Sequence, residues 1–204
     1  MTFNTLASHA QIETVKTTLS QRGVQVEVFV DGASVLERIQ ALIPSSASVL
    51  TGSSQSLIEI GFEDLLKSGE HPWNNLKDEL LKASMTQQYD LRRQGTLADF
   101  FVASVHAICE TGEVLIASAS GSQLPAYAFS SPNVIWVAGT QKIVPDLETG
   151  LRRLREYSLP QEDRAQKSRG GQGSFMGKTL IFEREAPYLG RNIHLLLVEE
   201  LVGV

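Results

Sequence analysis

Segments with the apolar pattern of β-strands alternate along this chain with segments that have the pattern of helices. The run VQVEVFV at 24–30 places four valines on one face, as a half-buried strand does. The run ASVLERIQALI at 33–43 repeats apolar residues at helical spacing and ends before Pro44. This alternation predicts a three-layer α/β/α domain with an open, mostly parallel sheet. Further strands are predicted at 47–50, 98–108, 113–118, 133–139 and 192–200, and further helices at 3–22, at 57–68, around 76–93, from 124 and at 146–157.

Length and composition are those of an ordinary globular protein. At 204 residues, 42% hydrophobic and 20% charged, the chain can form a single domain over 1–204 without a metal or a disulfide. Its net charge of −5 argues against nonspecific nucleic-acid binding, which requires clustered Lys and Arg. The sequence has one cysteine, Cys109, and neither an apolar leader nor a run of about 18 apolar residues. We therefore expect a cytoplasmic protein with no membrane span, and the sequence leaves self-association open.

The segment TGSSQS follows a predicted strand and precedes a predicted helix. In an open α/β sheet, ligands bind beyond the carboxyl ends of the strands. Glycine lets the backbone approach a ligand closely, and serines add hydroxyl donors. The segment does not match a G-x-S-x-G nucleophile elbow, because Ser56 stands where the second glycine is required. The alternative to a ligand site is that a serine here only caps the helix. The candidate ligand contacts in this segment are Thr51, Gly52, Ser53 and Ser54.

A tight link, ETG, joins two predicted strands and predicts a local antiparallel pair. Because positions i and i+4 of a strand share a face, we take His106 and Glu110 as a candidate acid–base pair. Thr111 and Gly112 beside them are candidate ligand contacts. The alternative is that Glu110 is a solvated turn residue and His106 a packed, hydrogen-bonded imidazole. The histidines show no metal-ligand spacing, so no metal site is predicted.

Three other segments bear on a ligand site. Lys142 follows the predicted strand 133–139 and would lie near its carboxyl end, where an anion can bind, although a surface lysine is an equal alternative. Gly121 and Ser122 belong to a loop of small residues and are further candidate contacts. Residues 161–174, QEDRAQKSRGGQGS, are polar and glycine-rich, which predicts a mobile surface loop.

With these residues in view, the chain resembles the LUD family of lactate-utilisation proteins. The resemblance covers roughly residues 45–204 and includes TGSSQSLIEIG, LRRQGTLADFFVASVHAICETGEVLIASASGSQLPAYAF, SPNVIWVAGTQKIVPDLETGLRRLR and GRNIHLLLVEELVGV. It implies the open α/β/α sheet of ribose-phosphate and glucosamine-phosphate isomerases and CoA transferases, with a ligand cleft at the strand ends. By the same resemblance, His106 stands where methylthioribose-phosphate isomerase has a catalytic aspartate, and Glu110 is the counterpart of the glutamate nucleophile of CoA transferases.

The resemblance also implies a role in the bacterial conversion of lactate to pyruvate. Long members of the family carry a cysteine cluster before the final strand, whereas residues 155–192 of this chain contain no cysteine. We therefore predict a non-redox accessory subunit without a cofactor, which binds a small anionic metabolite (lactate, a phosphosugar or a CoA ester) beside an iron–sulfur oxidoreductase partner. The alternatives are an independent phosphosugar isomerase-like or CoA-transferase-like enzyme that uses Glu110, or a pure interaction module. The sequence does not decide whether the chain is an enzyme.

Overall fold

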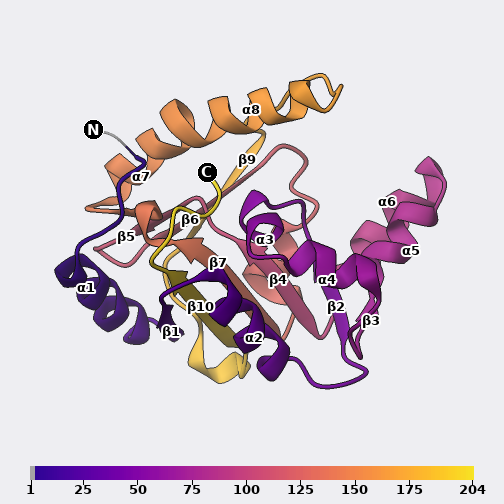
Figure 1. The fold of residues 1–204 in the computed structure, drawn as a ribbon, viewed down its shortest axis with the longest axis horizontal. Helices are drawn as coiled ribbons and strands as arrows, with labels where there is room; N and C mark the ends of the chain where they lie inside the picture. The colour runs from indigo at the N-terminus through magenta and orange to yellow at the C-terminus, as the bar shows by residue number, and fades with distance from the viewer. Residues whose placement is uncertain (1–2) are drawn as a thin grey trace.

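The computed structural model describes residues 3–204, and a six-stranded sheet lies at its centre (Figure 1). Its strands follow the order β1-β10-β7-β4-β2-β3, and every neighbouring pair is parallel. The last strand of the chain, β10, therefore lies between the first strand and β7. The strands of this sheet are β1 (Val24–Phe29), β2 (Ser48–Thr51), β3 (Asn74–Asn75), β4 (Phe100–Ser104), β7 (Asn133–Gly139) and β10 (Asn192–Val198).

Both faces of the main sheet are buried. Along β7, Trp136 belongs to one apolar cluster, while its neighbours Ile135 and Val137 belong to another on the opposite face. Leu195 and Leu196 of β10 divide between the two clusters in the same way. One face is covered by α2 (Gly32–Leu42), α3 (Gln55–Glu59) and α4 (Phe62–Ser68), and the other by α1 (His9–Ser20) and a second sheet. The predicted α/β fold with a mostly parallel sheet is therefore confirmed.

The second sheet has four strands in the order β8-β5-β6-β9. Its β5 and β6 are antiparallel, with Ala107 opposite Leu115, so the local pair predicted around the ETG link is confirmed. The sequence analysis did not predict β9, which extends this sheet along β6. The bounds of these strands are β5 (Ala107–Cys109), β6 (Val114–Ser118), β8 (Ile143–Val144) and β9 (Lys178–Phe182).

The apolar run at 98–108, predicted as one strand, forms two strands in different sheets. β4 ends at Ser104, and β5 begins three residues later in the second sheet. The Tyr127 hydroxyl donates a hydrogen bond to the Ser104 carbonyl, and the backbone N–H of His106 donates to the Leu115 carbonyl at 2.9 Å. The chain therefore leaves the main sheet after Ser104 and joins the second sheet at His106. This change of sheet places Ser104 at the carboxyl end of β4.

Two helices predicted as continuous are divided in the structure. The segment 57–68 is split between α3 and α4 at Gly61, whose φ of +83° lies in the left-handed region that glycine adopts without strain. The segment around 76–93 forms α5 (Leu76–Lys82) and α6 (Met85–Gly95), because Ser84 closes a capping box with Gln87 and starts a new helix.

The segment 161–174, predicted as a loop, is helical over its first half. A continuous helical path begins with α7 (Leu147–Arg153), passes through Leu154–Ser158 and ends with α8 (Leu159–Ser168). This path runs along one edge of the molecule in Figure 1. The prediction failed because the polar composition of α8 indicated a loop, whereas α8 extends a helix that is already nucleated and packed.

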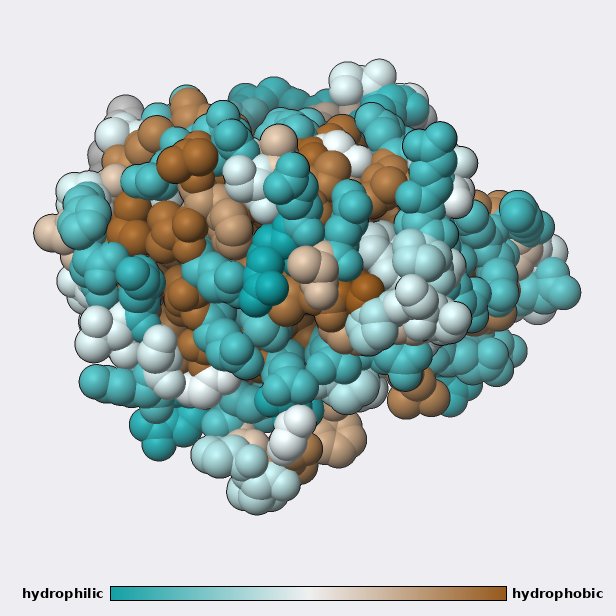
Figure 2. All heavy atoms as spheres, turned by 60° about the horizontal axis from the view of Figure 1, so that its bottom comes forward, coloured by the Kyte–Doolittle hydropathy of each residue, from teal (hydrophilic) through white to brown (hydrophobic). Residues whose placement is uncertain are grey.

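The surface is mixed in polarity. On the face drawn in Figure 2, polar residues cover most of the area and hydrophobic residues lie in smaller groups among them. Within residues 3–204, none of the helices has the length and apolar character needed to cross a membrane.

Candidate functional site

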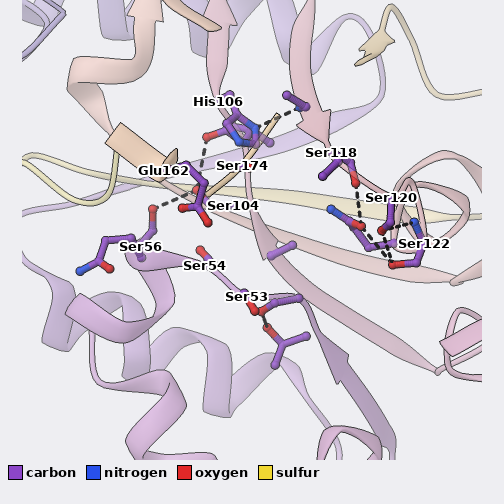
Figure 3. Close-up of a pocket in the computed structure, with 18 of the residues that line it drawn as sticks. Ser53, Ser54, Ser56, Ser104, His106, Ser118, Ser120, Ser122, Glu162 and Ser174 are labelled. Carbon is purple, nitrogen blue, oxygen red and sulfur yellow. Dashed lines mark hydrogen bonds between the residues drawn. The ribbon is translucent and has the colours of Figure 1, made fainter. Parts of the chain in front are cut away.

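A pocket of about 440 Å³ opens beyond the carboxyl ends of β2 and β4, where the strand-end rule for open α/β sheets places a ligand site. Residues from α5, α6, α8 and the segment before β9 complete its walls. Hydroxyl groups are frequent in its lining, as Figure 3 shows. The serines that line the pocket are Ser53, Ser54, Ser56, Ser104, Ser118, Ser120, Ser122, Ser158 and Ser174.

Three neighbouring strands bring Ser56, Ser104 and Lys142 together in this pocket. Ser104 ends β4, Ser56 lies in α3 just after β2, and Lys142 ends the 3₁₀ turn Thr140–Lys142 that follows β7. The Lys142 Nζ lies 3.0 Å from the Oγ of Ser56 and 3.0 Å from the Oγ of Ser104. The two Oγ atoms are themselves 3.0 Å apart, so the three groups form a closed triangle of hydrogen bonds. We call these three residues the Ser–Ser–Lys cluster.

Lys142 is a buried cation whose hydrogen-bond partners are hydroxyls. Lys142 is only 2% exposed, and no ion pair of Lys142 occurs within the part of the chain that the structure describes. Burial, together with the positive charge of Arg153, lowers the pKa of Lys142 to about 7. Glu59 acts in the opposite direction, but its carboxylate is engaged by the Gln55 amide at 2.9 Å and by the backbone N–H of Gly203 at 2.6 Å.

Arg153 is a second buried cation behind the pocket wall. Its side chain is fully buried, and its Nη1 donates to the His106 carbonyl and, at 2.9 Å, to the Ser158 Oγ. Among the residues that the structure describes, its Nε and Nη2 have no hydrogen-bond partner. Burial lowers the pKa of Arg153 to about 10, so the guanidinium is still charged at neutral pH. Arg153, together with the protonated fraction of Lys142, therefore gives this part of the pocket positive charge at neutral pH.

His106 lines the same pocket as a neutral imidazole. Burial and the charges of Lys142 and Arg153 lower its pKa to about 3. The His106 Nδ1 accepts a hydrogen bond from the backbone N–H of Ala117 at 3.2 Å, so the remaining proton is on Nε2. This geometry matches the alternative in which His106 is a packed, hydrogen-bonded imidazole.

Seven of the residues that the sequence analysis named as site candidates line this one pocket. Ser54 caps α3 by accepting from the Leu57 N–H, as the alternative predicted, and it also lines the pocket. Gly121 is not a lining residue but lies between two that are, Ser120 and Ser122; its φ is +82°, and a Cβ at this position would overlap the Lys178 side chain. The predicted residues that line the pocket are Thr51, Gly52, Ser53, Ser54, His106, Ser122 and Lys142.

The ETG link lies elsewhere, against α1. The Glu110 carboxylate accepts a hydrogen bond from the Gln11 side chain at 2.9 Å, and the Thr111 carbonyl accepts one from the Arg22 guanidinium at 2.5 Å. Gly112 also packs closely on Arg22. The structure does not bring these three residues to the pocket that holds His106 and Lys142. In residues 3–204, no group of three or more His, Cys, Asp and Glu side chains is placed to hold a metal ion.

Sequence reasoning missed Ser56, Ser104 and Arg153 as parts of the site. Ser104 and Arg153 are embedded in stretches whose pattern indicates only a buried strand and an amphipathic helix. The sequence gives no signal for Ser104, because it lies within the apolar run 98–108, and only the structure shows that β4 ends there.

Comparison with known proteins gives a family and a fold. The model of the LUD domain family matches residues 12–171. A DUF162 family protein from Deinococcus radiodurans has a similar crystal structure, with a TM-score of 0.53 and 12% identity over 94% of this chain and 98% of that chain, which shows a shared fold alone. A crystal structure of eIF2B delta from Chaetomium thermophilum gives a TM-score of 0.32 at 12% identity over 69% of this chain and 57% of that chain, too weak a likeness to carry an argument. No curated protein matches the chain.

Proposed function

We propose that this chain, which belongs to the LUD domain family, binds a small organic anion in the serine-lined pocket and serves organic-acid utilisation, lactate above all, as a non-redox component. One observation carries the proposal: Lys142 is a buried cation at the pocket without a carboxylate partner among the described residues. A buried charge is retained where something compensates it, and in this pocket an anionic ligand would supply the missing charge.

The surroundings of Lys142 fit an anion that carries hydroxyl or carbonyl oxygens. Ser56 and Ser104 offer O–H groups beside the ammonium, and Arg153 adds a second positive charge behind the wall. Apolar side chains such as Leu50 and Phe101 line the remaining wall and can accommodate the carbon skeleton. The pocket volume of about 440 Å³ exceeds what a three-carbon acid fills. Larger organic anions, namely phosphosugars and CoA esters, are therefore also candidate ligands.

The proposal assigns the redox chemistry to a partner. Iron–sulfur clusters are held by several cysteine thiolates, and this chain has one cysteine. We expect the purified chain to show no oxidation of lactate with an artificial electron acceptor, and to co-purify with an iron–sulfur oxidoreductase from its native host. Lactate oxidation by the isolated chain would overturn this part of the proposal.

Isothermal titration calorimetry tests the binding. L-lactate, pyruvate, ribose 5-phosphate and acetyl-CoA are titrated into the wild-type protein, into Lys142→Met and into Lys67→Met, which removes the charge of an exposed lysine in α4. At least one anion should bind the wild type and the Lys67 variant equally. It should bind Lys142→Met about 10- to 100-fold more weakly, because a charge-assisted hydrogen bond contributes about 1.5–3 kcal/mol.

The pH dependence of this affinity provides a second criterion. Because the pKa of Lys142 is about 7, affinity should fall by up to about tenfold per pH unit above 7 as the ammonium loses its proton. Equal affinity in the wild type and Lys142→Met, or an affinity that is flat from pH 6 to 9, would refute the role of Lys142.

A further inference from the structure

The Ser–Ser–Lys cluster has the geometry of a nucleophile and its base. The Ser104 Oγ and the Lys142 Nζ are 3.0 Å apart, within the range of a direct proton transfer. Ser56 contacts both atoms at 3.0 Å and completes the arrangement as the third, orienting group. Figure 3 shows Ser56 and Ser104 joined by a hydrogen bond within the pocket. Anion binding alone does not require a serine hydroxyl bonded on one side to an amine.

We propose that Ser104 is an acyl-accepting nucleophile, that Lys142 is its general base, and that the pocket accepts an acyl ester or thioester. This activity goes beyond the binding of an organic anion proposed above, and it uses residues that the resemblance to acid- and phosphosugar-metabolising families does not assign.

Ser104, rather than Ser56, is placed to attack. Ser104 is partly exposed and lines the pocket, whereas Ser56 is 1% exposed. Each Oγ also has a backbone carbonyl within hydrogen-bond distance, that of Val105 at 3.3 Å for Ser104 and that of Val202 at 3.4 Å for Ser56, so exposure is what distinguishes the two serines. The Tyr127 hydroxyl bonds to the Ser104 carbonyl and fixes the backbone at the end of β4. Ser56 is therefore a positioning residue that holds the Lys142 amine toward Ser104.

Lys142 is the group in this pocket that can take a proton near neutral pH. Burial and the charge of Arg153 lower its pKa to about 7, so a large fraction of its side chain is the neutral amine at pH 7 to 8. An ordinary lysine, with a pKa near 10.4, is almost fully protonated there. His106 does not compete for this role, because its Nδ1 accepts from the backbone of Ala117 and its pKa is about 3.

The reaction balances with water as the final acceptor. The Ser104 Oγ forms a bond to the acyl carbonyl carbon while its proton passes to the neutral Lys142 amine. The carbonyl re-forms, the bond to the leaving group breaks, and the leaving alcohol or thiol takes the proton from the Lys142 ammonium. Water then attacks the Ser104 ester and gives one proton to Lys142, which returns it to the Ser104 oxygen as the carboxylic acid leaves.

The test uses p-nitrophenyl acetate as the probe. The protein is incubated with the ester, release of p-nitrophenol is followed in time, and the modified residue is located by peptide mass spectrometry. The variants are Ser104→Ala, Lys142→Met, Ser56→Ala and, as a matched control, Ser45→Ala, an exposed serine between α2 and β2. The midpoint of thermal unfolding of each variant is measured first, so that a variant that fails to fold is recognised.

The proposal expects one acetyl group on Ser104 in the wild type and in Ser45→Ala. Release should rise with pH through about 7, and it should fall by about 10²-fold or more in Ser104→Ala and in Lys142→Met, as loss of a nucleophile or a general base predicts. In Ser56→Ala the pH at half-maximal rate should shift, because the amine loses a hydrogen-bond partner. A purely structural Ser56 would change stability and leave this pH unchanged.

Acetyl on Lys142 instead of Ser104 would overturn the proposal, and so would release from folded Ser104→Ala at the wild-type rate. Failure here is separable from failure of the proposed function. Calorimetry on Ser104→Ala, which keeps the Lys142 charge, should still detect the organic anion if binding alone is correct.

Discussion

Replacing Lys142 with methionine should stabilise the protein below neutral pH. The pKa of Lys142 falls from an ordinary value of 10.5 to about 7 on folding because the ammonium is buried beside Arg153. A shift of this size corresponds to about 5 kcal/mol of destabilisation when the group is protonated in both states, at about 1.4 kcal/mol per pKa unit. Methionine has a similar length and no charge to bury.

The variant also loses two hydrogen bonds, those from Lys142 to Ser56 and Ser104. At about 1 kcal/mol each, they offset part of the gain, and the two hydroxyls can still bond to each other. We therefore expect Lys142→Met to raise the free energy of unfolding by about 3 kcal/mol at pH 6.

The pH dependence separates this effect from general changes in packing. Below pH 7 the lysine is protonated in both states, and the full penalty is present. Between pH 7 and about 10.5 the unfolded chain binds more protons than the folded one, so the stability of the wild type rises with pH by up to about 1.4 kcal/mol per unit. The advantage of Lys142→Met should therefore shrink over this range.

Urea unfolding at pH 6, 7, 8 and 9 measures this difference, with the fluorescence of the buried Trp73 and Trp136 as the signal. Lys67→Met, which removes an exposed lysine, serves as the control and should differ from the wild type by the same small amount at every pH. A Lys142→Met variant that is less stable than the wild type at pH 6, or whose advantage does not change up to pH 9, would refute the reasoning.

Three further outcomes follow from the contacts. Burial raises the pKa of the Cys109 thiol to about 12, so iodoacetamide at pH 8 should leave the native protein unmodified and alkylate it in urea, as read by mass spectrometry. Gly112→Ala should lower the free energy of urea unfolding by about 1–3 kcal/mol, since φ is +102° and the new Cβ would overlap the Arg22 guanidinium. Glu185→Ala should cost about 3–5 kcal/mol by the same assay, because it leaves Arg191 buried without its carboxylate, now 2.6 Å away.

The sequence predicts the elements of this fold better than their arrangement. Apolar alternation and short apolar runs are local properties of the sequence. Alternation located the strand at 24–30, and apolar runs located those at 133–139 and 192–200, within a few residues. The insertion of β10 between β1 and β7 depends on pairing between segments far apart in the chain, which no local pattern records. For the same reason, the passage of the run 98–108 from one sheet to the other was not predicted.

For the candidate site, too, local sequence predicted some features and long-range packing determined the others. Ser53, Ser54 and Lys142 were predicted because the strand-end rule depends only on the order of strands and loops. The burial of Lys142 and Arg153 is a consequence of tertiary packing, and in the sequence each has the context of a surface cation. The chemistry proposed for the pocket depends on that burial, since an exposed lysine at the same position would keep its ordinary pKa.

The two proposals for the pocket draw on opposite protonation states of Lys142. Its ammonium form would hold an organic anion, and its neutral form would accept the proton of Ser104. With a pKa of about 7, both forms are well populated near neutral pH, so neither role excludes the other in the free protein. A bound anion favours the ammonium and raises the pKa of Lys142, which removes the base that Ser104 requires. If both proposals hold, organic anions are therefore inhibitors of acylation, and the inhibition weakens as pH rises above 7.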